Sequence, residues 1–414
     1  MAKNDVIAGL DVGSGRITCV IGEPNPDDQG MKILGGTSVP CSGVKGGIVL
    51  NIAETARSIR QAVEKAEEEA KQLVQGVYLG VRGKHLESAN NRGAYNIART
   101  DKEITHDDVK AVVGNARAIS ISGDREILHT IPQGFSLDRQ RGVPDPVGME
   151  GALLEVDVHI VTALVSHLNN LSKAVAEAGF DVLQTVYTPI ALGELVVTPE
   201  ERDLGCLLAD FGAQSISLAV YSEGALKFTK ELPIGTEFIT RDIAHALRTN
   251  MPTAERIKIE HGVAHPRLAG EDKDKEISYL GVDGRSPRST KKSMVLQVVL
   301  PRVEEIFTLI SDAVKDSPFE DAAQAGVILS GGGSMLLGMP EAAEQVLAMP
   351  ARLGLVPPGG IVGDEKFFDA TYASAIGLLC YPKSVLSGNL SRGNGSRKES
   401  RLTRRLKAWL KEIF

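Results

Sequence analysis

Two segments of the chain place an aspartate and a nearby glycine between two strand-like runs. The first is IAGLDVGSGRITCVIGE, with Asp11 and Gly13, and the second is CLLADFGAQSISLAVYSEG, with Asp210 and Gly212 at a constant offset of 199 residues. Glycine lets successive backbone N–H groups converge on an anion, and Mg²⁺ prefers few carboxylates and keeps its waters. Either copy alone could be an ordinary hairpin, but the matched pair predicts a duplicated domain whose turns clamp a triphosphate, with Mg²⁺ held by both aspartates through water.

A third glycine cluster occurs in VILSGGGSMLLGMPEAAEQVL. A buried-type strand at 327–329 precedes Gly331, Gly332 and Gly333, and a helix is expected to begin near Pro340. The segment matches neither the Walker motif nor the G-x-G-x-x-G fingerprint. Three successive glycines would permit a flat backbone surface for a nucleoside, which by itself is a weak signal.

Size and composition limit the possible classes. A chain of 414 residues exceeds what one hydrophobic core usually supports, so at least two lobes are expected. The net charge of −7 provides no basic face for nucleic acid. The sequence shows no signal peptide and no apolar run of about 18 residues, which favours a cytoplasmic protein. The four cysteines lack metal or redox spacing and are expected to be buried and reduced.

The elements around these motifs can be outlined from their patterns. Residues 53–74 predict a helix whose buried stripe includes Ala56, Ile59, Val63, Ala66, Ala70 and Leu73, with the acidic run 67–69 on a solvated face. Residues 84–161 mix alternating strands with a helix capped by Thr105, which indicates a small α+β insertion. Its scattered histidines are interpreted as structural or surface residues, because they lack ligand spacing.

The arrangement of the three glycine motifs resembles that of the actin-like ATPase superfamily. Within it, longer runs are similar to the FtsA family of bacterial cell-division proteins, from about residue 6 to the end. The matching runs are IPQGFSLDRQRGVPDPVGMEGALLEVDVHIVTA, TRDIAHALRTNMPTAERIKIEHGVA, GRSPRS, VVLPRVEEIF and DATYASAIGLLCY. The resemblance implies an α/β fold of the actin-like type, with two lobes, duplicated core domains and ATP in the cleft between them.

The resemblance also assigns ATP-binding roles to individual residues. Glu255 and Lys258 are three apart, so they share a helix face, which in such folds flanks the adenosine. The remaining candidates come from the first phosphate loop, the second phosphate loop and the adenosine motif: Asp11, Gly13, Ser14, Gly15 and Arg16; Asp210, Gly212, Ala213, Gln214 and Ser215; Gly331, Gly332, Gly333 and Ser334.

Three departures from the superfamily pattern concern hydrolysis. Ala213 and Gln214 stand where the second loop usually has glycines, and Ser217 replaces an acidic residue. Thr188 stands where many relatives have a glutamate that could orient a water. Loss of a carboxylate removes a candidate general base. We therefore expect ATP binding with slow or absent hydrolysis.

The resemblance further implies a division into subdomains and their partners. An insertion in the first lobe would contact neighbouring protomers and later division proteins. An insertion in the second lobe would receive the C-terminal peptide of FtsZ, with Arg285, Arg302 and Glu305 as candidates, although ordinary surface charges are the alternative. The expected ranges are 1–83 with 162–202, and 203–239 with 310–382, for the two cores; 84–161 and 240–309 for the insertions; 383–400 for a flexible linker; and 401–414 for a terminal helix.

The terminal segment RLTRRLKAWLKEIF predicts an amphipathic helix. It carries five basic residues and one acidic residue, in a chain that is acidic overall. Such a helix, too short to span a bilayer, is typical of binding to an anionic membrane surface, as the resemblance also implies. Docking into a partner groove or onto the protein itself remain alternatives. The expected membrane contacts are apolar on one side and basic on the other: Leu402, Leu406, Trp409, Leu410, Ile413 and Phe414; Arg401, Arg404, Arg405, Lys407 and Lys411.

Together these features predict a filament-forming, ATP-binding adaptor on the cytoplasmic face of the inner membrane that tethers FtsZ at the division site. The rivals are an actin-fold enzyme, such as a kinase or chaperone-type ATPase, and an actin-like scaffold of pilus or secretion machinery. The first would need a catalytic acid in the cleft. The second would not predict binding of the FtsZ peptide.

Overall fold

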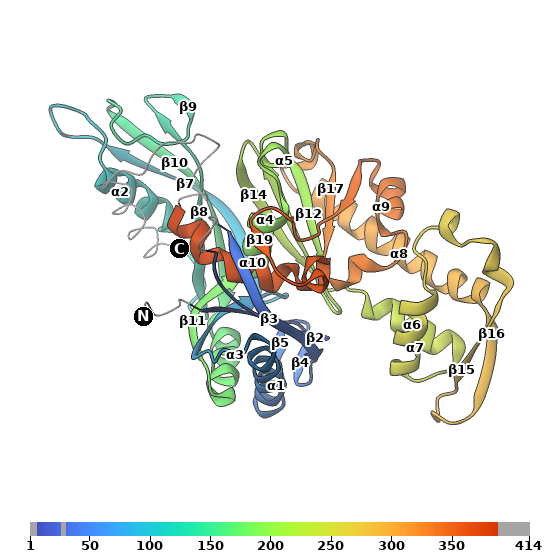
Figure 1. The fold of residues 1–414 in the computed structure, drawn as a ribbon. Helices are drawn as coiled ribbons and strands as arrows, with labels where there is room; N and C mark the ends of the chain where they lie inside the picture. Colours follow the sequence, from blue (N-terminus) through green and yellow to red (C-terminus); the bar gives the residue numbers. More distant parts are fainter. Residues whose placement is uncertain (1–5, 26–29, 388–414) are drawn as a thin grey trace.

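Two sheets face each other across one long helix in the computed structural model, which describes residues 6–25 and 30–387 (Figure 1). The first sheet has the strand order β11-β6-β1-β2-β3-β19 and the second has the order β14-β13-β12-β17-β18. In each sheet the first strand of a hairpin pairs with a parallel strand: β1 pairs with β6 in the first sheet, and β12 pairs with β17 in the second. This shared order supports the expected duplication.

The first lobe carries its helices around the first sheet. Helix α1 caps its N-terminus with the Asn51 side chain, which accepts from the backbone N–H of Glu54. The elements of this lobe are β1 (Ile7–Val12), β2 (Arg16–Pro24), β3 (Met31–Pro40), β4 (Val44–Lys45), β5 (Ile48–Val49), α1 (Ile52–Ala70), β6 (Gly76–Val81), α3 (Val165–Ala178), β11 (Asp181–Tyr187), α4 (Thr188–Val196), β19 (Ile361–Val362) and α10 (Ala370–Ser387).

One part of the expected stripe on α1 is wrong. The helix ends at Ala70, because Lys71 adopts a left-handed conformation with φ 53°. Leu73 therefore lies beyond the helix and is 84% exposed. The acidic run lies on a solvated face as expected, because Glu68 and Glu69 are exposed and Glu67 is half-buried. Within it, Glu67 accepts from the N–H of Val74, and Glu69 accepts from the N–H of Gly36 and pairs with Lys366.

An α+β unit is inserted after β6 and has a hydrophobic core of its own. Its sheet has the order β7-β10-β8-β9, and helix α2 packs against β7 and β10. Thr105 caps α2 in a reciprocal capping box with Asp108, as expected. The elements are β7 (Leu86–Asn96), α2 (His106–Arg117), β8 (Arg125–Leu137), β9 (Gln140–Val143) and β10 (Leu153–Leu164).

The histidines expected to be structural include three buried ones in or beside this unit. Burial lowers the pKa of His85 to about 4, and that of His129 and His159 to about 3. His159 hydrogen-bonds Asn90 and Thr229, the second of which belongs to β14 of the other lobe. The inserted unit therefore packs directly against the second lobe.

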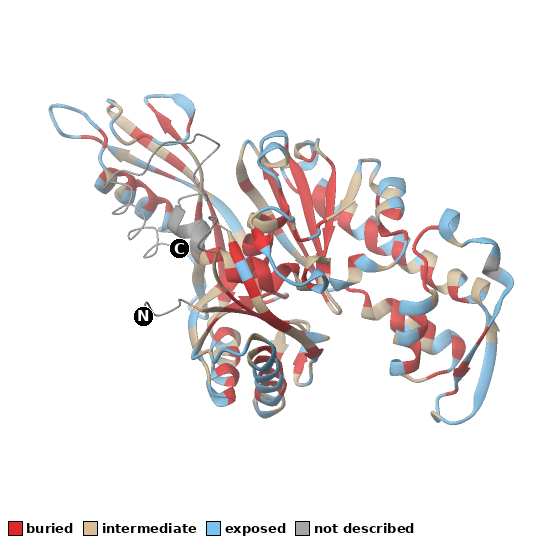
Figure 2. Ribbon diagram, viewed as in Figure 1, coloured by how far each residue is buried: buried red, intermediate tan, exposed pale blue. Residues whose placement is uncertain are grey.

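The second lobe comprises its sheet and a helical part at the far end of the molecule, where the hairpin β15–β16 is largely exposed (Figure 2). Helices α6 and α8 extend past residues 240 and 309, the expected limits of the insertion. The elements are α5 (Pro199–Leu204), β12 (Cys206–Phe211), β13 (Ile216–Ser222), β14 (Ala225–Leu232), α6 (Glu237–Leu247), α7 (Met251–His261), β15 (Glu276–Leu280), β16 (Pro287–Lys291), α8 (Lys292–Lys315), β17 (Val327–Ser330), α9 (Met339–Leu347) and β18 (Ala351–Leu353).

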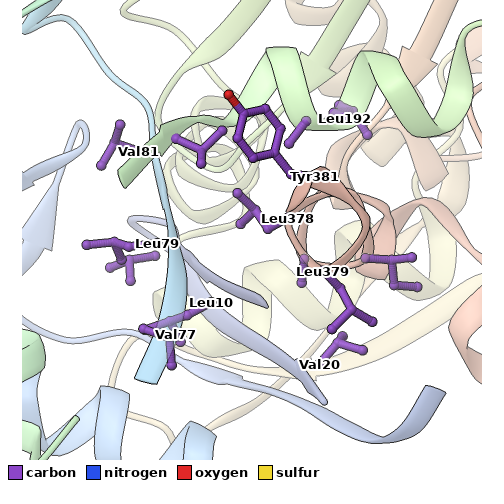
Figure 3. Close-up of a cluster of buried hydrophobic side chains, with 14 of the residues drawn as sticks. Leu10, Val20, Val77, Leu79, Val81, Leu192, Leu378, Leu379 and Tyr381 are labelled. Carbon is purple, nitrogen blue, oxygen red and sulfur yellow. The ribbon is translucent and has the colours of Figure 1, made fainter. Parts of the chain in front are cut away.

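The lobes share one hydrophobic cluster. Leu378, Leu379 and Tyr381 of α10 lie in the same buried cluster as Leu10 and Leu79 of the first sheet (Figure 3). Strand β12 is buried on both faces: Cys206 and Leu208 belong to this cluster, whereas Leu207, Ala209 and Phe211 belong to the cluster of the second lobe. Burial on both faces is the reason that this strand is almost continuously apolar.

Candidate functional site

The two Asp/Gly turns have the same geometry. Gly13 donates its N–H to the carbonyl of Arg16, and Gly212 donates to that of Ser215, both at 3.0 Å. In the flanking hairpins Asp11 is paired with Thr18, and Asp210 with Ser217. Both pairs keep the offset of 199 residues, so the internal repeat predicted from the sequence is confirmed.

The two turns lie tip to tip between the lobes. A Cβ built on Gly15 would come within 2.7 Å of the Ala213 Cβ, so a larger residue at 15 would push the turns apart. The β4–β5 turn braces both tips: Gly47 N–H donates to Ser14 Oγ at 3.0 Å, and Gly46 N–H donates to Gln214 Oε1 at 2.8 Å. The facing arrangement expected for a phosphate clamp is therefore present.

The third glycine cluster begins immediately beside Asp210. Gly331 has φ 78° and ψ 162°, and a Cβ there would lie 2.3 Å from Asp210 Oδ1. The chain then makes a 3₁₀ turn, η4 (Gly332–Met335), in which Ser334 donates from both N and Oγ to the Gly331 carbonyl. The segment is thus a tight turn rather than the flat surface expected.

Thr236 connects the second Asp/Gly turn to the third glycine cluster and to Lys258. This residue was not among those expected from the sequence. Its N–H donates to the Gly212 carbonyl at 3.1 Å, and its side chain lies where a Cβ on Gly333 would collide. Lys258 Nζ donates to its carbonyl at 3.4 Å and forms an ion pair with Glu255 at 2.8 Å. The expected shared face of Glu255 and Lys258 on α7 is therefore confirmed.

The carboxylates of the two hairpins are joined by an arginine that sequence reasoning also missed. Arg82 follows β6 directly; its Nη2 lies 2.6 Å from Asp11 Oδ2 and its Nη1 lies 2.8 Å from Asp210 Oδ2. Burial alone would lower the pKa of Arg82, but the two aspartates hold it above its usual range, whereas burial raises the pKa of Asp210 despite Arg82. A charged residue at the carboxyl end of a buried strand was the available signal.

The carboxylate oxygens of Asp11 and Asp210 suit a hydrated divalent cation only in part. Oδ1 of Asp11 and Oδ1 of Asp210 are buried and have no hydrogen-bond partner, so they could accept from metal-bound waters. Their Oδ2 atoms, however, already bind the Arg82 guanidinium. Any Mg²⁺ would have to share the carboxylates with this cation.

Some expected or notable residues point elsewhere. Arg16 is exposed and donates from Nε to Ser38 Oγ at 2.8 Å and from Nη2 to the Ser38 carbonyl, so the structure does not bring its guanidinium to the other loops. Thr188 is fully buried and donates to the Val81 carbonyl at 3.2 Å.

Glu231 accepts from Gly83 N–H and Tyr187 Oη, and burial raises its pKa to about 7. Glu231 therefore links the lobes.

The residues expected to meet an FtsZ peptide lie on the helical part of the second lobe. Arg302 on α8 pairs with Asp242 at 2.6 Å and also with Glu305. Arg285 is exposed in the turn between β15 and β16, where Asp283 accepts from its N–H. The guanidinium of Arg302 is thus oriented by two acids of its own lobe.

The expected membrane contacts fall in 401–414, outside the described residues, as does most of the expected linker. Helix α10 runs to Ser387, so the first residues of the expected flexible linker, 383–387, belong to this helix. Among the described residues no helix has the length and apolar character to cross a bilayer.

The two facing lobes, their repeated hairpins and the glycine turns define an actin-like protein. The chain resembles the solved PilM–PilN type IV pilus biogenesis complex with a TM-score of 0.64 at 18% identity, covering 91% of this chain and 98% of that one. It also resembles MreB5 of Spiroplasma citri bound to ADP, with a TM-score of 0.53 at 11% identity, covering 94% and 99%. At these identities the likeness establishes the fold alone.

Sequence comparison identifies the family. A model for the SHS2 domain inserted in FtsA matches residues 83–162, and a model for the cell division protein FtsA matches residues 207–377. The chain is 33% identical to the cell division protein FtsA of Pseudomonas aeruginosa over 99% of this chain and 98% of that protein. It is also 33% identical to that of Borreliella burgdorferi over 100% of both, and 31% identical to that of Escherichia coli K12 over 99% and 96%. The chain belongs to the FtsA family of actin-like cell-division proteins.

Proposed function

We propose that this protein binds ATP in the cleft between its lobes. The observation that supports this most strongly is the contact between the tips of the two repeated turns, with the Gly331–Ser334 turn beside Asp210 and Lys258 reaching Thr236. Backbone N–H groups that converge in glycine-containing turns favour an anionic phosphate chain. The candidate residues of the two Asp/Gly turns, at 11–16 and 210–215, would hold the phosphates, and Glu255 with Lys258 would flank the adenosine.

Mg²⁺ would accompany the nucleotide through water-mediated contacts to the free Oδ1 atoms of Asp11 and Asp210. We propose that ATP turns over slowly or not at all. Thr188 presents no carboxylate, and its hydroxyl is committed to the Val81 carbonyl. A general base or water-orienting carboxylate is therefore missing at the position where relatives place one.

A matched pair of variants tests nucleotide binding. Ser14→Asn and Ser14→Asp both retain an oxygen that can accept from Gly47 N–H; they are nearly equal in size, and the aspartate adds a negative charge where the asparagine has a neutral amide. Because a carboxylate at this turn would repel the phosphates, we expect ATP to bind Ser14→Asp at least about tenfold more weakly than Ser14→Asn by isothermal titration calorimetry. Equal affinities for the two variants would remove the phosphates from this turn.

We also propose that the protein forms filaments on the cytoplasmic face of the inner membrane at the division site. Residues 401–414, with their apolar stripe and basic side, would attach it reversibly, and filament formation would strengthen attachment by avidity. Co-sedimentation with anionic liposomes, with ATP present, would compare the full chain, a chain ending at Ser400, and Trp409→Glu. Only the full chain should sediment with lipid; equal sedimentation of all three would eliminate this anchor.

We propose that the attached filaments tether FtsZ through the helical part of the second lobe and recruit later division proteins through the inserted unit. Arg302 and Glu305 on α8 and Arg285 on the β15–β16 turn would orient the FtsZ C-terminal peptide. In a fluorescence-anisotropy titration with that peptide, Arg302→Ala should weaken binding by about tenfold, whereas the control Arg241→Ala should not. No binding of the peptide by the unaltered protein would favour an actin-like scaffold of another machinery.

A further inference from the structure

The side chain of Gln214 joins the two lobes at the tips of the Asp/Gly turns. Its Oε1 accepts from the N–H of Gly46, on the β4–β5 turn of the first lobe, at 2.8 Å. Its Nε2 donates to Glu237 Oε2, at the start of α6 in the second lobe, at 2.6 Å. Only this orientation of the amide satisfies both partners, because a backbone N–H donates and a carboxylate accepts. One side chain therefore forms a bridge with one hydrogen bond to each lobe.

Each end of this bridge is fixed to its own lobe. On the first lobe, Gly47 N–H donates to Ser14 Oγ at 3.0 Å, which attaches the β4–β5 turn to the first Asp/Gly turn. On the second lobe, Glu237 N–H donates to the Ala213 carbonyl at 2.8 Å, which attaches the start of α6 to the second turn. Any separation of the turns therefore acts directly on the two hydrogen bonds of the bridge.

The bridge lies at the solvent edge of the contact between the turns. Gln214, Gly46 and Glu237 are only half-buried, whereas Arg82 and Asp210, which form an ion pair between the lobes, are buried. Phosphates clamped between the turns are released only when the turns separate at this edge. That separation breaks at least one of the two hydrogen bonds of Gln214.

Resting on the proposed ATP binding, we propose that Gln214 is a latch that controls how fast the nucleotide enters and leaves the cleft. All groups of the latch belong to the chain itself, so it closes with or without nucleotide, and it opens for both entry and release. The latch therefore slows both steps and leaves the equilibrium affinity nearly unchanged. Gln214 stands where the superfamily pattern has a glycine, which has no side chain to form the bridge. It is a positioning residue rather than a catalytic one.

Stopped-flow fluorescence with mant-ATP and Mg²⁺, on the full-length protein, tests the latch. Gln214→Met keeps the length of the side chain and loses both hydrogen bonds. Release and association should each become about tenfold faster, with the dissociation constant within about threefold of that of the unaltered protein. Glu237→Met, which also serves if Gln214→Met does not fold, removes one bond and should accelerate release by about threefold. The matched control Gln75→Met makes the same change at an exposed glutamine and should leave both rates unchanged.

The double variant of Gln214 and Glu237 separates one shared bridge from two independent effects. It should release mant-ATP no faster than Gln214→Met alone, because both changes act on the same bridge. Additive acceleration would overturn the latch, as would an unchanged release rate for Gln214→Met. Faster release with unchanged association would also overturn it, because Gln214 would then be a contact to the nucleotide.

Hydrogen–deuterium exchange of the nucleotide-free protein tests the bridge without ATP. The β4–β5 turn, where Gly46 N–H is bonded to Gln214, should exchange faster in Gln214→Met than in the unaltered protein, and equal exchange would overturn the proposal. If this difference is seen but the unaltered protein binds no mant-ATP, the proposed function fails and the role of the latch in nucleotide exchange fails with it.

Discussion

Replacement of Gly331 by alanine should destabilise the protein far more than the same change one residue later. Gly331 has φ 78° and ψ 162°, a region essentially restricted to glycine. A Cβ there would lie 2.3 Å from Asp210 Oδ1 and 2.8 Å from the Phe211 carbonyl. A Cβ on Gly332 would meet nothing within 4 Å. Comparing Gly331→Ala with Gly332→Ala therefore separates the cost of a strained backbone and a steric clash from the effect of replacing any glycine by alanine.

The size of the effect follows from two contributions. Forcing alanine into this conformation costs about 2 kcal/mol, and displacement of strand β12 from the turn adds to it, giving about 3 kcal/mol in the free energy of unfolding. Gly332→Ala should change that free energy by less than about 0.5 kcal/mol.

Urea denaturation followed by circular dichroism, with both variants and the unaltered protein at one pH, measures this difference. The expected result is a lower midpoint for Gly331→Ala with an unchanged slope. Equal midpoints for the two variants would refute the assignment of this turn as a glycine-dependent support for Asp210. Nucleotide-free samples should be used, because a bound ligand would add its own stabilisation.

Three further results are expected. Burial raises the pKa of Glu231 to about 7, so its contribution to stability is present at low pH and is lost as the pH rises toward 7. In urea titrations the free energy of unfolding of the unaltered protein should fall by about 2 kcal/mol relative to that of Glu231→Gln between about pH 5 and about pH 7.5. A difference between the two proteins that stays constant with pH would contradict this. Val63→Ala, at a fully buried site on α1, should cost about 2 kcal/mol in the same assay, and Leu73→Ala, at an exposed site, should cost less than about 0.5; similar costs would contradict the observed helix end. Phosphate release from ATP should stay below about 1 per second, and a faster rate would require a base that Thr188 does not supply.

Local features of the fold were predictable from the sequence. The offset of 199 residues between the hairpins is visible in the letters, and the structure reproduces it in the strand pairing of Asp11 and Asp210. The cap at Thr105 was predictable because its hydroxyl and the Asp108 carboxylate satisfy each other within one turn of chain. These features depend on neighbours in sequence or on a repeated pattern.

Features that depend on contacts between distant segments were not predictable in this way. Arg82 follows an ordinary buried strand, and its role depends on two aspartates that only the closure of the lobes brings together. Thr236 likewise acquires its position from contacts with Gly212 and Gly333. The end of α1 was misplaced because Lys71 leaves the helix while the apolar spacing continues to Leu73.

The central claim is that one nucleotide contacts three segments that are distant in sequence. Hydrogen–deuterium exchange of the full chain with and without ATP, analysed by mass spectrometry, tests it directly. ATP should slow exchange together in the turns at 13–16 and 212–215 and in η4, while helix α2 of the inserted unit remains unchanged. Protection confined to one of these turns, or located in the inserted unit, would contradict a nucleotide held between the lobes.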